Sequence, residues 1–435
     1  MPGGPGRAHG GGMELQLAPH PPATTATPAT GATPGTRATG APAGGTTRAA
    51  RATGAPAGGT TRDGRAAATA GPTGSGSGPS AERDPLLDLL RTGAILVVVA
   101  WHWVFTLLTW HHGPHTDNPV GTVPGLWLLT WFMQVMPLFF LTAAALTSAD
   151  RRRGREFLAN RYRRLVPPVL PLVVPAVAVA VALDHFGRGD LARALVLAIS
   201  PMWFLVVLAV LTALTPLTRR LHRAGPAAVL PWVAVAALAD FARFTGGESL
   251  PLTLVSFVAV WGAVWQIGFL FPRLRRAGRP TRVAVAAVGL AGLAVGALVG
   301  PYDAAMVGAN AVRNSNMGPP TLMVVALAVF QAGVVALAAG PLTRFARRAR
   351  RRLDRVSEQA MTIFVWHLPC QGVAWAIMVL AGVPLAHRFG LQWWAQRPLW
   401  ALLPGLLLAL VLERSRRLGA QRPKAAARAA MATRS

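Results

Sequence analysis

The chain has 435 residues, of which 52% are hydrophobic and only 14% are charged. Because soluble domains carry about 25% charged residues, this composition indicates a membrane protein. The formal net charge of +27 could suggest nucleic acid as a partner, but the arginines form short clusters between long apolar runs and build no basic domain, so we exclude that class.

Residues 1–83 form a tail rich in Gly, Ala, Pro, Thr and Arg that shows no apolar periodicity. The piece "RATGAPAGGTTR" occurs at 37–48 and again at 51–62, and it is too short and polar to be a solenoid unit. Such a segment cannot bury enough apolar surface to offset its ordering entropy, so we expect it to be disordered. It is either a tether to anionic lipid or a partner, or a dispensable segment.

From residue 84 to residue 412 the sequence predicts an all-α, polytopic membrane domain. A spanning helix needs about 20 mostly apolar residues, and ten segments satisfy this requirement. The expected spans are residues 88–109, 123–146, 165–183, 199–217, 227–244, 250–271, 282–300, 320–339, 359–382 and 392–412. Residues 413–435 follow as a basic tail.

The loops between these segments alternate in charge. Arginine-rich loops such as "RRRGREFLANRYRR" and "PRLRRAGRPTR" follow every even-numbered span, whereas loops such as "TGGES" follow the odd-numbered ones. By the positive-inside rule, both termini are cytoplasmic in a multi-pass protein of the plasma membrane. A missed or extra span would break the alternation, so it supports the count of ten.

Arg91 and His102 are polar residues in an otherwise apolar first span. Eleven residues of helix correspond to about 16 Å and to roughly 20° past three full turns, so both side chains leave the same helix face. Arg91 alone would be typical of an interfacial anchor. His102 could make a hydrogen bond between helices, but histidine in mid-span is rarer and favours a functional role. Together they predict a polar stripe that faces a functional channel, because polar residues inside a membrane are costly.

Three further places carry candidate site residues. His367 precedes Pro369, which frees a backbone carbonyl, so His367 either bonds to that backbone or faces a cavity. Arg161 and Arg163 open the third span as a topology signal or as a clamp for phosphate. Trp203 opens the fourth span, where an interfacial aromatic is expected.

No metal site is expected from this sequence. His111, His112 and His115 lie in the loop after the first span, where a solvated polar loop is the favoured interpretation over a metal site. The single cysteine, Cys370, excludes an internal disulfide and a cysteine-based metal cluster.

The spacing Arg91-x10-His102 resembles the motif of the acyltransferase-3 family of bacterial integral-membrane O-acyltransferases. The preceding "LLDLLR" is similar to that family's "DGLR", with Asp88 in place and Leu89 where glycine is common. The segment "QVMPLFFLTAAAL" resembles its "FFxxSGF", with Thr142 and Ala143 at the positions of serine and glycine. "RYRRLVPP", "PMWFL" and "FVWHLP" are similar to three further elements in the same order, so the resemblance covers about residues 84–412.

This resemblance implies a membrane acyltransferase that uses acyl-CoA as co-substrate and holds no permanent cofactor. It implies that Arg91, Arg161 and Arg163 hold the CoA at the cytoplasmic face and that His102 is the catalytic base. It assigns His367, with Trp203, to the acceptor, which would be a hydroxyl of a carbohydrate, an envelope glycan or a secondary metabolite. Acetyl is the default acyl group, and membrane lipids are the surroundings.

Two other functions remain open from the residues alone. A ten-span transporter or flippase would usually carry acidic residues near the membrane midplane. Apart from Asp88, which begins the first expected span, only Asp240, near one end of the fifth, falls inside one. A catalytically inactive relative or an assembly partner would retain its function after His102→Ala. Release of CoA that depends on His102 distinguishes the enzyme from both.

Overall fold

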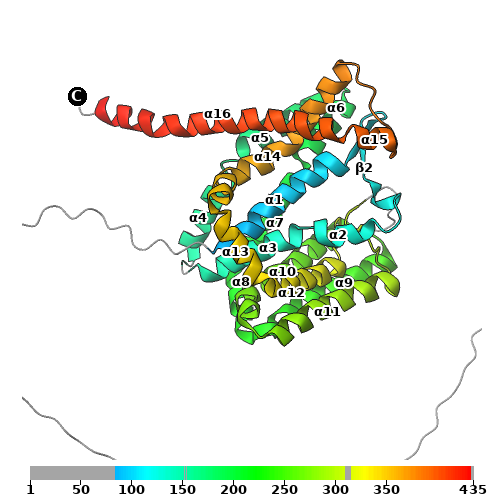
Figure 1. Ribbon diagram of the computed structural model, residues 1–435, viewed down its shortest axis with the longest axis vertical. Coiled ribbons are helices and arrows are strands. Elements are labelled where there is room, and N and C mark those ends of the chain that lie inside the picture. Colours follow the sequence, from blue (N-terminus) through cyan, green and yellow to red (C-terminus); the bar gives the residue numbers. More distant parts are fainter. Residues whose placement is uncertain (1–83, 151, 153, 309–314, 433–435) are drawn as a thin grey trace, which may run out of the picture. The chain divides into compact units, whose positions relative to one another are not determined.

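The computed structural model describes residues 84–150, 152, 154–308 and 315–432. The tail expected at residues 1–83 therefore lies outside the described residues. Almost all of the described chain is helical (Figure 1). The elements are α1 (Pro85–Phe105), β1 (Leu107–Trp110), β2 (Pro114–Asp117), η1 (Pro119–Gly121), α2 (Trp127–Met133), α3 (Met136–Ala149), α4 (Gly154–Leu165), α5 (Leu170–His185), α6 (Gly189–Ile199), η2 (Ser200–Met202), α7 (Trp203–Ala213), α8 (Thr215–Leu221), η3 (His222–Val229), α9 (Leu230–Gly246), α10 (Leu250–Arg276), α11 (Arg279–Leu298), α12 (Leu322–Leu337), α13 (Ala339–Arg348), α14 (Arg350–Leu380), α15 (Leu391–Ala395) and α16 (Arg397–Ala432).

The apolar helices agree with the all-α membrane architecture expected from the sequence. Within the described residues, eight helical segments are long and apolar enough to cross a membrane, and a ninth is the pair α12 and α13, which meet at a bend of 70°. The shorter apolar helix α5 coincides with the third expected span. Each of the ten expected segments thus contains an apolar helix, and the chain is a multi-pass membrane protein.

Three boundaries differ from the sequence expectation. The first span was expected to reach residue 109, but α1 ends at Phe105 and the chain enters an antiparallel hairpin of β1 and β2, in which Leu107 pairs with Asp117. Pro167 and Pro168 separate α4 from α5, because proline removes a backbone donor and fixes φ. Helix α16 continues to Ala432, through most of the segment expected to be a basic tail.

The core of the membrane domain lies where α10 packs against α3, α9 and α12. Trp261 and Trp265 of α10 are almost completely buried, and Trp261 contacts Phe140 of α3 with ring centroids 4.6 Å apart. Helices α11 and α12 approach so closely that a Cβ atom on Gly289 would collide with the backbone of Phe330. Small residues allow such contacts between membrane helices, because backbones meet without side chains between them.

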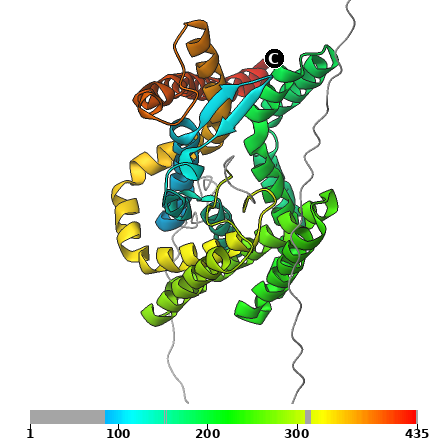
Figure 2. The same cartoon turned by 90° about the vertical axis from the view of Figure 1, so that its right-hand side faces the viewer.

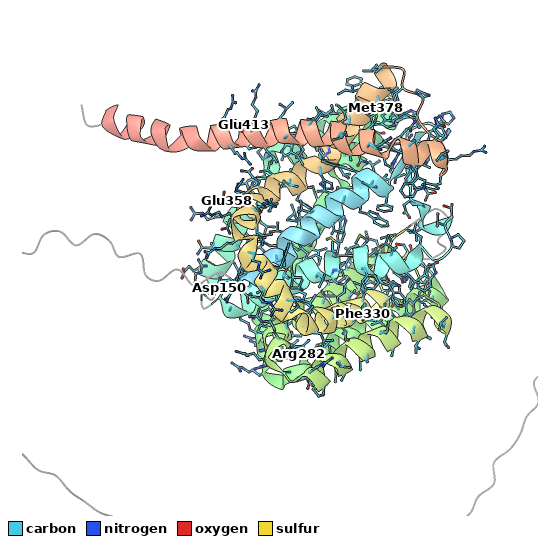
Figure 3. The ribbon with its side chains drawn as sticks, viewed as in Figure 1. Asp150, Arg282, Phe330, Glu358, Met378 and Glu413 are labelled. Atoms are coloured by element: carbon cyan, nitrogen blue, oxygen red, sulfur yellow. The ribbon has the colours of Figure 1, made fainter. Side chains whose placement is uncertain are left out.

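The bundle has two chemically different ends (Figures 1 and 2). At one end, which we call the basic end, Arg275 at the close of α10 bonds Asp84 at 2.6 Å, and Arg219 of α8 bonds the backbone of Asp150 at 2.8 Å. The other end carries the β1–β2 hairpin, which faces the viewer in Figure 2, and we call it the hairpin end. Figure 3 shows Asp150 and Glu358 toward the basic end and Met378 toward the hairpin end.

Helices α1 and α14 run parallel through the bundle. Arg91 of α1 contacts Ser357 of α14, and eleven residues later His102 contacts His367, ten residues beyond Ser357. Both polar residues of α1 therefore face the same neighbour. The geometry agrees with the single polar stripe expected from the spacing of Arg91 and His102.

Candidate active site

His102 lies one turn before the hairpin end of α1. This helix begins at Pro85, where Asp84 accepts a hydrogen bond from the backbone N–H of Leu86 at 3.0 Å and so caps the first turn. It ends at Phe105, because Thr106 adopts an extended conformation. The intervening residues are mostly apolar, so the helix carries an imidazole deep into the bundle.

The hydrogen bond of His102 defines its tautomer. The Nδ1 atom lies 2.7 Å from the backbone oxygen of Val98, one turn earlier. A carbonyl oxygen can only accept, so Nδ1 carries a proton and donates it. In the neutral imidazole, Nε2 is then the atom with the free lone pair. The ring can therefore accept a proton at Nε2.

His367 meets His102 from the facing helix. The two rings lie edge to face with centroids 5.1 Å apart. His367 is completely buried, and its Nδ1 donates to the backbone oxygen of Phe364 at 2.6 Å, one residue before the carbonyl that Pro369 frees. Its Nε2 has no hydrogen-bond partner among the described residues. His367 therefore bonds to local backbone, the first of the two alternatives that the sequence left open, although its acceptor is the carbonyl next to the freed one, and it contacts the polar stripe through His102.

Two hydrogen bonds to backbone oxygens hold α1 and α14 in register around the histidines. The indole Nε1 of Trp103 donates to the backbone oxygen of His367 at 3.0 Å. The amide Nε2 of Gln371 donates in the other direction, to the backbone oxygen of His102 at 2.7 Å. Buried polar groups gain most when they are fully paired, so these bonds resist sliding of the two helices.

A cavity of about 270 Å³ opens beside His102. Trp203 lines it together with His102, and Trp203 stacks obliquely on Trp261 with centroids 6.0 Å apart. The lining is mainly apolar and aromatic, with few polar groups, as in sites for small ligands. The other lining residues are Val98, Trp101, Met133, Gln134, Met136, Ser200, Pro201, Phe204, Val307, Gly308, Met317 and Phe364.

Arg91 lies on the same face of α1 as His102 but nearer the basic end. Its NH2 donates to the hydroxyl of Ser357 at 2.6 Å and lies 3.7 Å from the carboxylate of Asp88, one turn earlier. One third of the side chain is exposed, so the guanidinium can still reach a ligand. Ser357 is a contact that sequence reasoning missed, because a serine near a helix start carries no distinctive signal.

Arg161 and Arg163 occupy α4, apart from the histidine pair. Arg161 donates to the hydroxyl of Thr147 at 2.9 Å, and its guanidinium lies 5.6 Å from the ring centre of Phe157. Arg163 is exposed. The structure therefore places His102 and Trp203 at one cavity, with His367 in contact with His102 but not on the lining, and places the two α4 arginines near the basic end.

The hairpin histidines make local contacts. His115 donates to the backbone oxygen of His111 at 3.0 Å, and Arg193 bonds the backbone oxygen of His112. Within the described ranges, no group of three or more His, Cys, Asp or Glu residues is arranged to hold a metal ion. The His115 side chain therefore contributes to the local structure of the hairpin, whereas His111 and His112 take part through their backbone oxygens.

Comparison with known proteins identifies the family. The model of the family described as an acyltransferase domain, acyltransferase-3, matches residues 84–413, about three quarters of the chain. No curated protein and no solved structure matches the chain significantly. The matched region includes the histidine pair, the cavity and the parallel helices α1 and α14. The chain therefore belongs to the acyltransferase-3 family and is a membrane acyltransferase.

Proposed function

We propose that this acyltransferase moves an acyl group, by default acetyl, from acyl-CoA to a hydroxyl of a carbohydrate, an envelope glycan or a secondary metabolite. The observation that carries the proposal is the orientation of His102, whose Nδ1 is bound to Val98 while the ring borders the cavity. An imidazole held in this tautomer can accept a proton from a hydroxyl near neutral pH.

In the proposed reaction, His102 acts as a general base. The acceptor hydroxyl gives its proton to Nε2 of His102, and its oxygen attacks the thioester carbonyl carbon. The carbon–sulfur bond breaks, the acyl group forms an ester with the acceptor, and the thiolate of CoA leaves. The proton on His102 returns to the thiolate, so the base is regenerated for the next turnover.

The acyl-CoA donor is assigned to the basic end. Arg91 presents a guanidinium on the face of α1 that also carries His102, and Arg161 and Arg163 add positive charge on α4. Guanidinium groups bind phosphate through paired, charge-assisted hydrogen bonds. The arginine-rich loops at this end support a cytoplasmic location for it and for both termini, in the plasma membrane.

The acceptor is assigned to the cavity beside His102. Trp203 offers an aromatic face, on which sugar rings commonly stack, and Gln134 and Ser200 supply polar groups on the same lining. His367 touches His102 and lies within the same cluster of rings, so it acts on the orientation of the base. A bacterial carbohydrate with a free hydroxyl fits this combination of an aromatic wall and a few polar groups.

Release of CoA thiol tests the proposal. Membranes that contain the full chain are incubated with acetyl-CoA and a cell-envelope extract as acceptor, and free thiol is followed over time. His102→Ala should abolish the release, whereas the matched control His387→Ala, at an exposed position outside the cavity, should leave it unchanged. Equal release by the wild type and by His102→Ala would overturn the assignment. Solute transport by vesicles without any thiol release would favour a transporter.

A further inference from the structure

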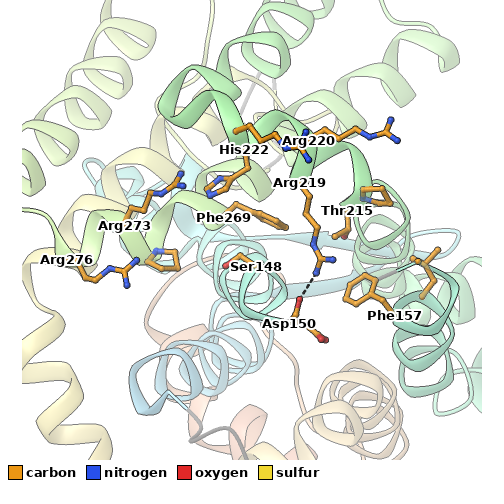
Figure 4. Close-up of a pocket in the computed structure, with 15 residues that line it drawn as sticks. Ser148, Asp150, Phe157, Thr215, Arg219, Arg220, His222, Phe269, Arg273 and Arg276 are labelled. Carbon is orange, nitrogen blue, oxygen red and sulfur yellow. Dashed lines mark hydrogen bonds between the residues drawn. The ribbon is translucent and has the colours of Figure 1, made fainter. Parts of the chain in front are cut away.

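A second cavity lies at the basic end (Figure 4). Its walls come from the C-terminal ends of α3 and α10, the N-terminal part of α4, helix α8 and η3. It encloses about 620 Å³ and is lined by five arginines. It shares no lining residue with the cavity beside His102. On the sequence alone, these arginines have a role in topology only, because each cluster stands at the end of an apolar segment.

Most of these arginines have no partner of their own. Arg220, Arg223, Arg273 and Arg276 are exposed, and within the described residues their side chains make no hydrogen bond or ion pair. The neighbouring Arg275 differs, because it bonds Asp84 at 2.6 Å. Guanidinium groups that line one hollow without counter-charge repel one another, so an anion bound among them lowers the free energy of the arrangement.

The acidic residue of the cavity does not supply this counter-charge. Both carboxylate oxygens of Asp150 are engaged by Arg152, at 3.2 Å from Nε and 3.3 Å from NH2. Burial alone would raise the pKa of Asp150, but the hydrogen bonds and the charge of Arg152 outweigh it and lower that pKa. The carboxylate therefore remains ionised and paired with Arg152.

The remaining wall of the cavity is aromatic. Figure 4 shows Phe269 between Arg273 and Arg219, with Phe157 at the other side. The ring of His222 meets Phe269 at a centroid distance of 5.9 Å, and the guanidinium of Arg219 covers the ring of Phe157 at 5.2 Å. A ligand that fits this lining carries negative charge on one part and an apolar or ring-shaped group on another.

We propose that this cavity binds a phosphate group of an amphipathic ligand, with Arg273 and Arg276 as its principal contacts. The two residues stand three apart in the last turn of α10, so their guanidinium forks can grip one phosphate from neighbouring positions. The phosphate belongs either to a soluble nucleotide or to the headgroup of an anionic phospholipid. The nucleotide source rests on the proposed function, since it would be the far end of the acyl-CoA donor; the lipid source does not.

The placement of the two cavities suits either source. Met136 at one end of α3 lines the cavity beside His102, and Ser148 at the other end lines the basic cavity. Twelve residues of helix separate them by about 18 Å. An extended pantetheine arm can cover a separation of this order, and a lipid headgroup can enter from the membrane surface beside α10.

Binding measurements on the purified full chain in a neutral detergent test the proposal. Native mass spectrometry records occupancy with two separate probes, adenosine 3′,5′-bisphosphate and a short-chain phosphatidylglycerol. The test variant is Arg273→Gln with Arg276→Gln. The matched control is Arg279→Gln with Arg347→Gln, which removes the same charge from exposed positions outside the cavity. A third variant, Arg273→Lys with Arg276→Lys, keeps the charge but loses the fork.

We expect at least one probe to bind the wild type and the control equally and the Gln variant about tenfold or more weakly, as for lost charge-assisted hydrogen bonds. The Lys variant should lie between them, which separates loss of the site from loss of the fold. Dependence confined to the bisphosphate identifies a nucleotide, and dependence confined to phosphatidylglycerol identifies a lipid. The proposal is overturned if the test and control variants weaken probe binding equally, or if neither variant weakens it. The assay needs no turnover, so its result is independent of whether His102 proves catalytic.

Discussion

His102 of α1 and His367 of α14 meet edge to face, with ring centroids 5.1 Å apart, and each ring donates its Nδ1 proton to a backbone oxygen of its own helix. Both rings therefore direct Nε2 away from the backbone. Of the two, only His102 lines the cavity, whereas Nε2 of His367 is buried without a partner among the described residues. In the proposed reaction, this arrangement distinguishes the base from the group that positions it.

Substitution of the two histidines should separate these roles. His102→Gln is expected to lower the rate of acyl transfer by about 10²–10⁴-fold, the usual contribution of a general base. His367→Gln should cause a smaller loss, and the double variant should be no slower than His102→Gln, because His367 acts through His102. The measurement is thiol release as a function of pH. Additive losses in the double variant, or a loss in His367→Gln without any loss in His102→Gln, would contradict the scheme.

Ser357 should affect the donor rather than the acceptor. Its hydroxyl accepts from Arg91 at 2.6 Å and so orients the guanidinium. Ser357→Ala is expected to raise KM for acyl-CoA about two- to tenfold, as for loss of one hydrogen bond, with kcat little changed. The matched control is Ser249→Ala, which removes an exposed hydroxyl that makes no capping hydrogen bond at the start of α10. If Ser357→Ala changed KM for the acceptor and not KM for acyl-CoA, the assignment of Arg91 to the donor would be wrong.

Gly289 should be intolerant of a side chain. A Cβ atom there would collide with the backbone of Phe330, so Gly289→Ala has to push α11 away from α12. We expect a loss of about 1–3 kcal/mol in stability. The matched control is Gly372→Ala in α14, where a Cβ atom meets nothing within 4 Å. Thermal unfolding in detergent should show a lower midpoint for the first variant only.

Tyr302 should make stability depend on alkaline pH. Its hydroxyl donates to Asp240 at 2.9 Å, and burial, followed by the Asp240 carboxylate, raises the pKa of Tyr302 well above its ordinary value. A group whose pKa is raised on folding stabilises the fold below its unfolded pKa, about 10, and loses that contribution as the pH rises further. The thermal unfolding midpoint of the wild type should therefore decrease as the pH rises above about 10. Tyr302→Phe should have a lower midpoint at pH 8, and its midpoint should change less above about pH 10. Parallel curves for the two proteins would contradict this.

Much of the architecture could be predicted because hydropathy and loop charge act over whole segments. Each expected span contains an apolar helix, and the Arg91-x10-His102 spacing led to a single face because helix geometry is regular. The differences between the expected and the observed helix boundaries are local. Prolines at 167, 168 and 201 divide helices. The hairpin after α1 depends on the pairing of Leu107 with Asp117, which the residue pattern of α1 does not predict.

The remaining features depend on contacts between distant segments. The sequence marks His102, His367 and Trp203 each as a candidate. The contact of His102 with His367, and the cavity that His102 shares with Trp203, are properties of helix packing. Ser357 and Gln371 carry no signal in a single sequence, since serine and glutamine are common at helix surfaces. Arg273 and Arg276 resemble any basic loop until α8 and η3 are placed beside them.

Helix α3 connects the surroundings of His102 to the basic cavity, with Met136 at one and Ser148 at the other. In the proposed reaction, the enzyme can therefore be inhibited from two directions that do not interfere sterically. In sealed vesicles of known orientation, a charged competitor at the basic end would act only when supplied to the compartment that this end faces, and an acceptor analogue would act from the opposite compartment. The side of the membrane from which each inhibitor acts thus depends on the length of α3, which separates the two cavities.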